Sequence, residues 1–243
     1  CDWSSDVCSS DLDIGEGKLA QTEDIFEVIM SNLYPIKDMI GTKVLVTAGP
    51  TIAPIDPVRF ITNRSSGKMG YAIAKEARDR GAVVTLISGP SNEKTPFGIN
   101  VLRINTNEEM RAAVLNNYED TDIVIKAAAV SDFKPKVYCS SKIKKSANGL
   151  TLEFVRDNDI LQELGLHKKK QILVGFAAES NDLLQNAKAK LLKKNLDYII
   201  ANDITATDIG FGTENNKVVI LSKDNNPILL DKMPKKEVDR ELD

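Results

Sequence analysis

The sequence is poor in the residues on which several common kinds of site depend. Of its 243 residues only one is a histidine, His167, and three are cysteines, at positions 1, 8 and 139. A Ser-His-Asp triad and a histidine-based zinc centre both need partners around a histidine, whereas His167 opens a polar His-Lys-Lys-Lys run that is typical of a solvated loop. Three cysteines make neither a disulfide framework nor a metal-ligand pattern, which favours a reducing cytoplasm. Catalysis should therefore rest on lysine, asparagine, aspartate, backbone N–H groups and a bound cation.

An excess of either charge and long apolar runs are also missing. Lys and Arg number 32 and Asp and Glu 35, for a net charge of −3. This balance gives no electrostatic case for nucleic acid or an anionic membrane as a partner. No apolar run reaches the roughly 18 residues of a membrane span, and no charged-then-apolar leader opens the sequence. The length is sufficient for one large α/β domain with a sizeable core.

What the sequence does have is a regular alternation of apolar runs and helical patterns. The runs predict strands near 43–48, 82–88, 99–104, 122–127, 171–177 and 197–201, and the patterns predict helices at 66–80, 106–117, 158–165 and 181–194. Thr106 and Glu109 form a capping box at the start of the second helix. The fold class that follows is α/β, with a doubly wound, mostly parallel, Rossmann-like sheet. A C-terminal β-hairpin appendage over 217–222 and 227–230, and a short charged helix from Lys235, complete the prediction.

Three regions differ in composition. Residues 1–12 are rich in Ser, Asp and Cys and lack periodicity, so we interpret them as disordered or foreign to the fold. Residues 13–41 contain a helical pattern that Thr22 could cap, with an apolar stripe of Ile25, Phe26, Ile29 and Leu33, followed by a linker over 35–41. Residues 42–243 form the main domain.

The most informative stretch runs from Val44 to Pro90. An apolar run ends in Ala48-Gly49-Pro50-Thr51, a polar loop follows, and Gly67 and Gly70 then open a helix. Glycine lets the backbone approach an anion closely, and the N–H groups of a helix N-terminus can hold it. An ordinary βαβ turn is the alternative. The segments TAGPT, AAAVSDF, GFAAE and AND all lie at expected carboxyl ends of strands, where doubly wound sheets bind their substrates.

Seven segments, in order, resemble the phosphopantothenoylcysteine synthetase family, the ligase of coenzyme A synthesis. They are TAGPT at 47–51, DPVRFITNRSSGKMG at 56–70, AAAVSDF at 127–133, KIKK at 142–145, GFAAE at 175–179, KLLKKNLD at 190–197 and AND at 201–203. In bacteria this ligase is usually the C-terminal half of a bifunctional protein. Residues 13–34 resemble the end of the flavin-dependent decarboxylase half that precedes it, and nearly all of that half would be absent, so no flavin is expected.

The resemblance implies a reaction and its partners. CTP with Mg²⁺ would activate the carboxylate of 4′-phosphopantothenate as an acyl-cytidylate, with release of pyrophosphate. The amine of L-cysteine would then attack to give 4′-phosphopantothenoyl-L-cysteine and CMP. The family also points to a cytoplasmic homodimer whose other partners are small molecules. A homodimer is favoured independently by the hairpin and the basic loop near Lys142, because a parallel sheet requires neither.

The family implies catalytic roles for Asn63 and Lys190. The alternatives are that Asn63 is a turn residue and that Lys190, with Lys193 and Lys194, complements a helix dipole. A lysine near the triphosphate would stabilise charge that develops on the transferred phosphoryl group. The substrate-binding set is Asp56, Arg59, Asn63, Ala128, Lys142 and Lys144. For Asp56 and Arg59 a loop salt bridge is the alternative, and for the lysines a solvated charge run.

The predicted nucleotide site combines the two small-residue turns with polar side chains. In the family the 175–178 backbone reads the cytosine nucleotide, although small residues there could simply permit tight packing. No metal ligands are assigned. The nucleotide-binding set is Gly49, Thr51, Ser65, Ser66, Gly67, Lys68, Gly175, Phe176, Ala177, Ala178, Asn181, Lys190, Asn202 and Phe211.

Two other functions stay open at this point. A short-chain NADP reductase fits the length, the βαβ start and the Tyr138-x-x-x-Lys142 spacing. However, no G-x-G-x-x-G follows the first strand, and Ser88-Gly89 ends the second without an acidic residue for a ribose. Pro135 and Gly149 also leave little room for a long helix there. The third possibility is an inactive nucleotide-binding fragment.

Overall fold

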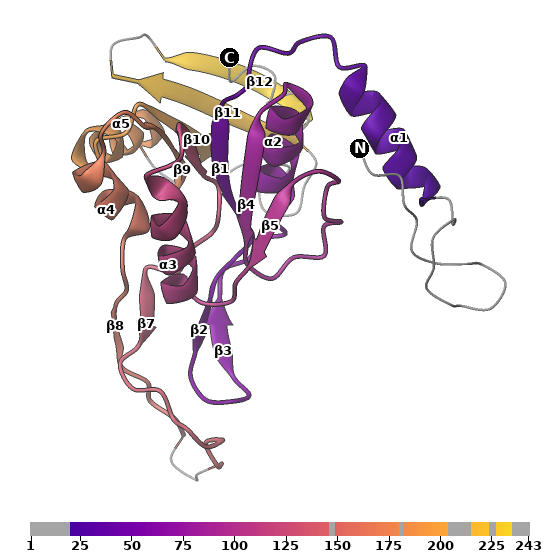
Figure 1. Ribbon diagram of the computed structural model, residues 1–243. Coiled ribbons are helices and arrows are strands. Elements are labelled where there is room, and N and C mark those ends of the chain that lie inside the picture. The colour runs from indigo at the N-terminus through magenta and orange to yellow at the C-terminus, as the bar shows by residue number, and fades with distance from the viewer. Residues whose placement is uncertain (1–19, 146–148, 180–181, 204–214, 224–226, 235–243) are drawn as a thin grey trace, which may run out of the picture.

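The computed structural model describes residues 20–145, 149–179, 182–203, 215–223 and 227–234 (Figure 1). Its centre is an eight-stranded sheet with the order β12-β11-β10-β9-β6-β1-β4-β5. The strands are β1 (Lys43–Ala48), β4 (Val83–Ser88), β5 (Asn100–Arg103), β6 (Ile123–Lys126), β9 (Ile172–Glu179), β10 (Tyr198–Asp203), β11 (Asn215–Ser222) and β12 (Ile228–Pro234).

Six neighbouring strands of this sheet are parallel, in the order β5, β4, β1, β6, β9 and β10. This arrangement confirms the predicted doubly wound sheet. The chain runs outward from β1 through β4 to β5, then returns to β6 on the other side of β1 and runs outward through β9 to β10. A switch point therefore lies between the carboxyl ends of β1 and β6. The predicted C-terminal hairpin is confirmed as β11 and β12, and it is joined to the sheet because β11 pairs with β10 in the antiparallel sense.

Helices cover both faces of the sheet. The first face carries α2 (Lys68–Asp79), whose Tyr71, Ile73 and Ala74 pack with Val44 and Val46 of β1. The opposite face carries α3 (Asn107–Tyr118), α4 (Ile160–His167) and α5 (Leu183–Lys193). The capping box at the start of α3 is present as predicted. His167, expected in a loop, is instead the last residue of α4, where its exposed ring lies against Glu163 O.

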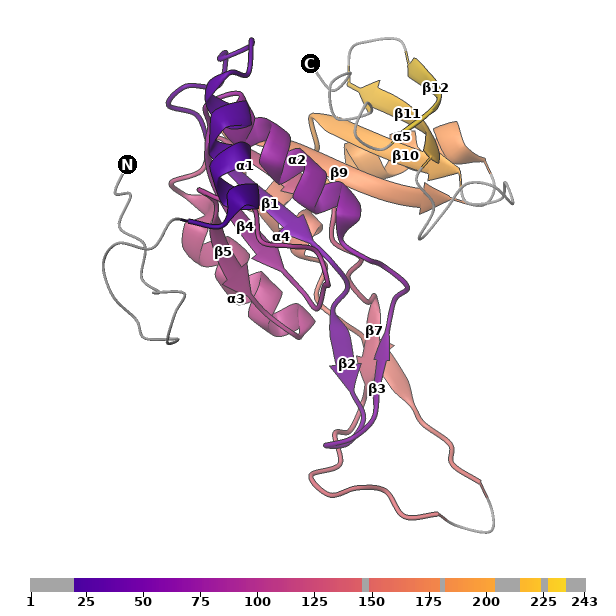
Figure 2. The same cartoon turned by 90° about the vertical axis from the view of Figure 1, so that its right-hand side faces the viewer.

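Two short hairpins, which the sequence did not predict, extend from the carboxyl edge of the sheet. One pairs β2 (Ile52–Pro54) with β3 (Phe60–Thr62), and the other pairs β7 (Phe133–Pro135) with β8 (Phe154–Arg156). They lie side by side and form an arm that reaches away from the main sheet (Figures 1 and 2).

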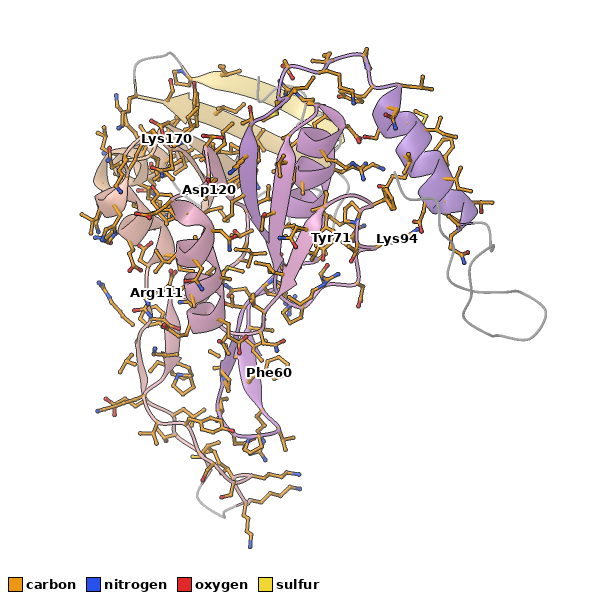
Figure 3. The ribbon with its side chains drawn as sticks, in the orientation of Figure 1. Phe60, Tyr71, Lys94, Arg111, Asp120 and Lys170 are labelled. Atoms are coloured by element: carbon orange, nitrogen blue, oxygen red, sulfur yellow. The ribbon has the colours of Figure 1, made fainter. Side chains whose placement is uncertain are left out.

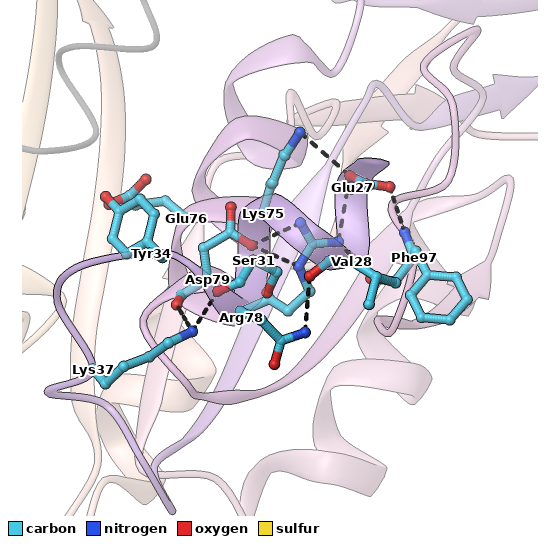
Figure 4. Close-up of polar contacts among 11 residues, drawn as sticks. Glu27, Val28, Ser31, Tyr34, Lys37, Lys75, Glu76, Arg78, Asp79 and Phe97 are labelled. Atoms are coloured by element: carbon cyan, nitrogen blue, oxygen red, sulfur yellow. Dashed lines mark hydrogen bonds and ion pairs between the residues drawn. The ribbon is translucent and has the colours of Figure 1, made fainter. Parts of the chain in front are cut away.

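The first described helix, α1 (Thr22–Asn32), lies outside α2. Gln21 is its N-cap residue and makes no side-chain cap bond, so the expected cap at Thr22 was wrong. Polar contacts join the two helices: Glu27 forms ion pairs of 3.3 Å with Lys75 and Arg78 (Figure 4). No helix among the described residues is long and apolar enough to cross a membrane.

Candidate functional site

Three loops meet at the carboxyl end of β1 with almost no space between them. Gly49 (φ 71°) and Gly67 (φ 85°) both adopt left-handed backbone conformations, which favour glycine. A Cβ on Gly67 would lie 3.0 Å from Ser91 Oγ and 3.2 Å from Gly49 N, and one on Gly89 would lie 1.8 Å from Pro50 O. We call residues 49–51, 65–67 and 89–91 the glycine cradle. Its close packing explains why small residues occur there.

The glycine cradle contains the N-terminus of α2. Gly67 is the N-cap residue and provides no side-chain bond to the helix, while Ser66 Oγ accepts from Lys68 N at 3.4 Å. Ser91 Oγ donates to Ser66 O at 2.7 Å and ties the second loop to the third. The Lys68 side chain is exposed and that of Ser65 is half-buried. The first N–H groups of a helix and its positive dipole end together favour a bound anion.

Asn63 lies at the switch point. Its Nδ2 donates to Ala129 O at 3.2 Å and to Val130 O at 3.0 Å, in the segment that follows β6. Buried Thr51 reaches the same segment, because Thr51 Oγ1 accepts from Ser131 N at 3.1 Å. The structure thus brings Asn63, Thr51 and the Ala128 segment together between the ends of β1 and β6.

Asp56, which is buried, and Arg59, which is half-buried, form an anchor for the arm. Asp56 Oδ2 accepts from Arg59 Nη1 at 2.7 Å and from Ile143 N at 3.1 Å, while its Oδ1 accepts from two further backbone N–H groups. Burial acts to raise the pKa of the Asp56 carboxyl, but these N–H donors and Arg59 outweigh it and lower that pKa. Arg59 also donates twice to Ile143 O. The pair therefore fixes the loop whose exposed Lys142 and Lys144 flank Ile143.

The end of β9 offers an unpaired backbone edge. Gly175 itself lies within the ladder, between Lys126 of β6 and Ile199 of β10, and a Cβ there would lie 2.8 Å from Leu196 Cδ1. This close contact supports the alternative in which a glycine occurs at position 175 because of tight packing. Beyond it, residues 176–179 pair only with β10 among the described residues. Alternate residues of this stretch, which includes Phe176, Ala177 and Ala178, direct backbone groups toward the β6 side.

Asn202 faces Ala178 across the β9–β10 pair. Its Oδ1 is buried and has no hydrogen-bond partner in the part of the chain that the structure describes. An unpaired buried acceptor is uncommon in native proteins and is satisfied when a ligand brings a donor. Asn181 and Phe211 lie outside the described residues.

Lys190 lies apart from the groups described so far. It is exposed on α5, and its backbone O accepts from Lys194 N in the basic last turn. A helix that follows a parallel strand starts at the carboxyl edge of the sheet and runs back. Lys190 comes seven residues after the first residue of α5, about 10 Å along the axis from that edge. This position fits the helix-dipole alternative as well as a catalytic one.

Lys126, which the sequence reasoning passed over, is a buried amine beside the switch point. Its Nζ lies 3.5 Å from Met110 Sδ and makes no other hydrogen bond within the described residues. Burial lowers the pKa of the Lys126 ammonium from 10.5 to about 7, opposed by the charge of Asp159 and assisted by that of Lys194. No sequence signal marked it, because a lysine at the end of an apolar run usually extends into solvent.

The reductase alternative loses its main support. Tyr138 and Lys142 lie in irregular structure between β7 and β8, and both side chains are exposed. They therefore do not share a helix face, as a catalytic Tyr-x-x-x-Lys pair would.

The fold and the site place the chain among the doubly wound α/β proteins that bind ligands where the strand order reverses. The sequence profile of the DNA/pantothenate metabolism flavoprotein C-terminal domain family matches residues 39–242, and the chain belongs to this family.

Named relatives agree with the family. The chain is 47% identical over 232 residues to the coenzyme A biosynthesis bifunctional protein CoaBC of Bacillus subtilis (strain 168), covering 94% of this chain and 57% of that protein. It is 43% identical over 239 residues to the protein of the same name from Borreliella burgdorferi, covering 97% and 59%. The crystal structure of the C-terminal domain of such a protein superposes with a TM-score of 0.73 at 41% identity, covering 85% of this chain and 94% of that one. The chain thus spans less than two thirds of the length of these two bifunctional relatives.

Proposed function

We propose that this chain joins 4′-phosphopantothenate and L-cysteine through a CTP-derived acyl-cytidylate, as a phosphopantothenate–cysteine ligase of coenzyme A synthesis. The observation that carries the proposal is the arrangement at the switch point, where the glycine cradle, Asn63 and the unpaired edge of β9 lie around the ends of β1 and β6 in a chain of this family. The two relatives, which are named as bifunctional proteins of coenzyme A biosynthesis, support the same assignment.

Each part of the site has a task in this reaction. The N-terminus of α2 and the Ser65–Lys68 segment hold phosphate oxygens, because N–H groups, hydroxyls and an exposed ammonium converge there. The unpaired backbone beyond Gly175, together with Asn202, binds the base through donors and acceptors of fixed geometry. The loop fixed at Ile143 brings Lys142 and Lys144 toward the phosphopantothenate.

Asn63 orients the acyl group. Its amide already bridges to the carbonyl groups of Ala129 and Val130, so its position is held before any substrate arrives. Both N–H groups of this amide are bonded to carbonyl groups, so one of them would exchange its carbonyl for the acyl oxygen and stabilise negative charge there. Activation of the carboxylate is needed because hydroxide is a poor leaving group, and cysteine then displaces CMP.

We further propose that Mg²⁺ enters with the triphosphate. Mg²⁺ usually binds through substrate phosphates and one or two carboxylates rather than in an all-protein cage. The described residues contain no group of three His, Cys, Asp or Glu side chains that could hold a metal. When bound, the ion would neutralise phosphate charge.

A homodimer is the proposed assembly, with the arm as its contact surface. Large apolar side chains are exposed on both hairpins, including Phe60 (53% exposed), which Figure 3 labels, and Phe133 (51% exposed). Apolar patches of this kind mark contact surfaces. We prefer the arm to the C-terminal hairpin as the interface because the arm exposes these large apolar side chains. Light scattering at micromolar concentration should give a dimer, and Phe60→Glu should shift it toward monomer. A monomer mass for the unchanged protein would contradict the assembly.

We also propose that residues 13–41 are the tail and linker of a preceding domain, and that residues 42–243 are the ligase domain. The polar side of α1 faces α2, whereas Phe26 (64% exposed) and Leu33 (71%) face outward. A helix normally buries its apolar side, so we infer that a domain preceding this helix in the sequence packs against its apolar side. The family is a C-terminal domain, and the matched relatives are longer.

Nucleotide titration tests the assignment. In the presence of Mg²⁺ we expect CTP to bind more tightly than ATP, and NADPH to bind weakly or not at all. Tight NADPH binding without CTP binding would favour a reductase. CTP binding without turnover would favour an inactive nucleotide-binding fragment.

A further inference from the structure

A chain of hydroxyl groups lies directly behind the glycine cradle. Arg103, at the end of β5, donates from Nη1 to Tyr71 Oη. Tyr71 Oη donates to Ser88 Oγ at 3.0 Å, and Ser88 Oγ donates to Gly89 O at 2.8 Å. Tyr71 Oη accepts one bond and donates one, and Ser88 Oγ accepts a second, longer bond of 3.5 Å directly from Arg103 Nη1, so all the donors point from Arg103 toward the cradle. Bonds arranged in this way polarise and strengthen one another.

The relay is buried and joins three elements. Tyr71, in the first turns of α2, is 4% exposed, and Ser88, at the end of β4, is fully buried. Figure 3 shows Tyr71 close to β5 and α2. The guanidinium of Arg103 also lies over the Tyr71 ring, 5.8 Å from its centroid, and Nη2 donates to Thr95 Oγ1 at 2.8 Å. Arg103 makes no ion pair within the described residues, so its donors serve hydroxyl groups.

The relay ends on the backbone that shapes the cradle. Gly89 N donates to Ala48 O at 3.0 Å, and a Cβ on Gly49 would lie 3.2 Å from Gly89 O, the atom on which the relay ends. Two residues later, Ser91 Oγ holds Ser66 O. A shift of Gly89 would therefore move both sides of the helix entrance, because no slack separates these loops.

We propose that Tyr71 is a positioning residue for phosphate binding: its hydroxyl fixes Gly89, and thereby sets the spacing between Gly49 and the α2 entrance at which phosphate oxygens bind. This inference rests on the proposed function and extends it from the groups that touch the nucleotide to one that does not. Tyr71→Phe keeps the ring and the packing but removes the middle of the relay.

The test compares Tyr71→Phe with a matched control, Tyr118→Phe. Tyr118 is likewise 4% exposed, and its Oη donates to Leu164 O at 3.0 Å on the opposite face of the sheet. Each variant loses one buried hydroxyl group, which makes two bonds in the case of Tyr71 and one in the case of Tyr118, so Tyr71→Phe should lose somewhat more thermal stability. Calorimetry with CTP and Mg²⁺ should show roughly three- to tenfold weaker binding for Tyr71→Phe alone, the equivalent of about one hydrogen bond. Binding of cytidine, which lacks phosphates, should be the same for all three proteins.

Ser88→Ala provides a second perturbation of the same relay and replaces Tyr71→Phe if that variant fails to fold. We expect it to weaken CTP binding to a similar extent, and the double variant to be little worse than either single one, because both break one connected unit. Equal CTP affinity for the wild type and Tyr71→Phe, or equal weakening by Tyr71→Phe and Tyr118→Phe, would overturn the positioning role and leave the proposed function intact. A wild-type protein that binds no CTP would overturn both.

Discussion

Replacing Lys126 by methionine should stabilise the protein in a pH-dependent way. The amine is buried, and its hydrogen-bond partner among the described residues is the sulfur of Met110 at 3.5 Å. The attractive charge that acts on it belongs to Asp159, which already pairs with Lys194 at 2.9 Å. Methionine has a similar unbranched shape and no charge to desolvate, so it fits the same space.

The magnitude follows from the pKa. One pKa unit corresponds to about 1.4 kcal/mol, so a fall from 10.5 to about 7 disfavours the charged form of Lys126 by about 5 kcal/mol in the folded state. Because local relaxation reduces such penalties, we expect Lys126→Met to raise the free energy of unfolding at pH 7 by about 2–4 kcal/mol. In a domain of this size that is a rise in melting temperature of roughly 5–15 °C.

The sign of the pH dependence is fixed by proton binding. Between pH 7 and 10.5 the unfolded chain keeps the Lys126 proton while the folded chain has lost it. Because the unfolded state binds more protons, this lysine makes the wild type more stable as the pH rises through that window. Lys126→Met should lack that contribution, so its advantage over the wild type should be largest at or below pH 7 and shrink toward pH 10.

Urea unfolding at several pH values between 6 and 10 measures both effects. Lys43→Met is the control, because Lys43 lies on the neighbouring strand β1 with an exposed side chain that pairs with exposed Asp120. It should change the free energy of unfolding by less than about 0.5 kcal/mol. A Lys126→Met protein that is less stable than the wild type, or whose advantage is constant across this pH range, would refute the reasoning.

Three further substitutions test the site. Asn63→Asp puts a carboxylate against two carbonyl oxygens and should lower turnover roughly 10²-fold while CTP still binds. The control is Asn117→Asp, which changes a remote amide that is also bonded to a carbonyl and should leave turnover unchanged. Unchanged turnover in Asn63→Asp would mean that Asn63 is only a turn residue. Lys190→Gln should lower turnover far more than Lys193→Gln if Lys190 serves the transition state, whereas equal small effects on turnover and melting temperature would assign both lysines to the helix dipole. Asp56→Asn should raise the KM for phosphopantothenate more than that for CTP, because it loosens the loop at Ile143, and an equal change in both constants would argue against that anchor.

The parallel core was predictable because its signals are local. Continuous apolar runs such as 43–48 and 122–127 predict buried strands wherever helices cover both faces, and Thr106 with Glu109 marks the start of α3 without reference to the rest of the fold. The two hairpins of the arm were missed because strands of three residues are too short to show a period.

The site was harder to predict because its decisive contacts join distant segments. Asp56 could be read as a loop salt bridge or a substrate ligand, and only its bond to Ile143, 87 positions later, shows that it anchors the arm. Gly175 could serve close packing or base binding, and Leu161 and Leu196 supply the reason for a glycine there. Lys126 ends an apolar run, and its burial depends on Met110 of helix α3.

The measurement that tests the central claim most directly is pyrophosphate release in a coupled assay with CTP, Mg²⁺, 4′-phosphopantothenate and cysteine. The account predicts that pyrophosphate appears only when both CTP and phosphopantothenate are present, and that cysteine is then required for CMP and the amide product to form. Absence of pyrophosphate from a folded, CTP-binding protein, or release that does not depend on phosphopantothenate, would contradict it.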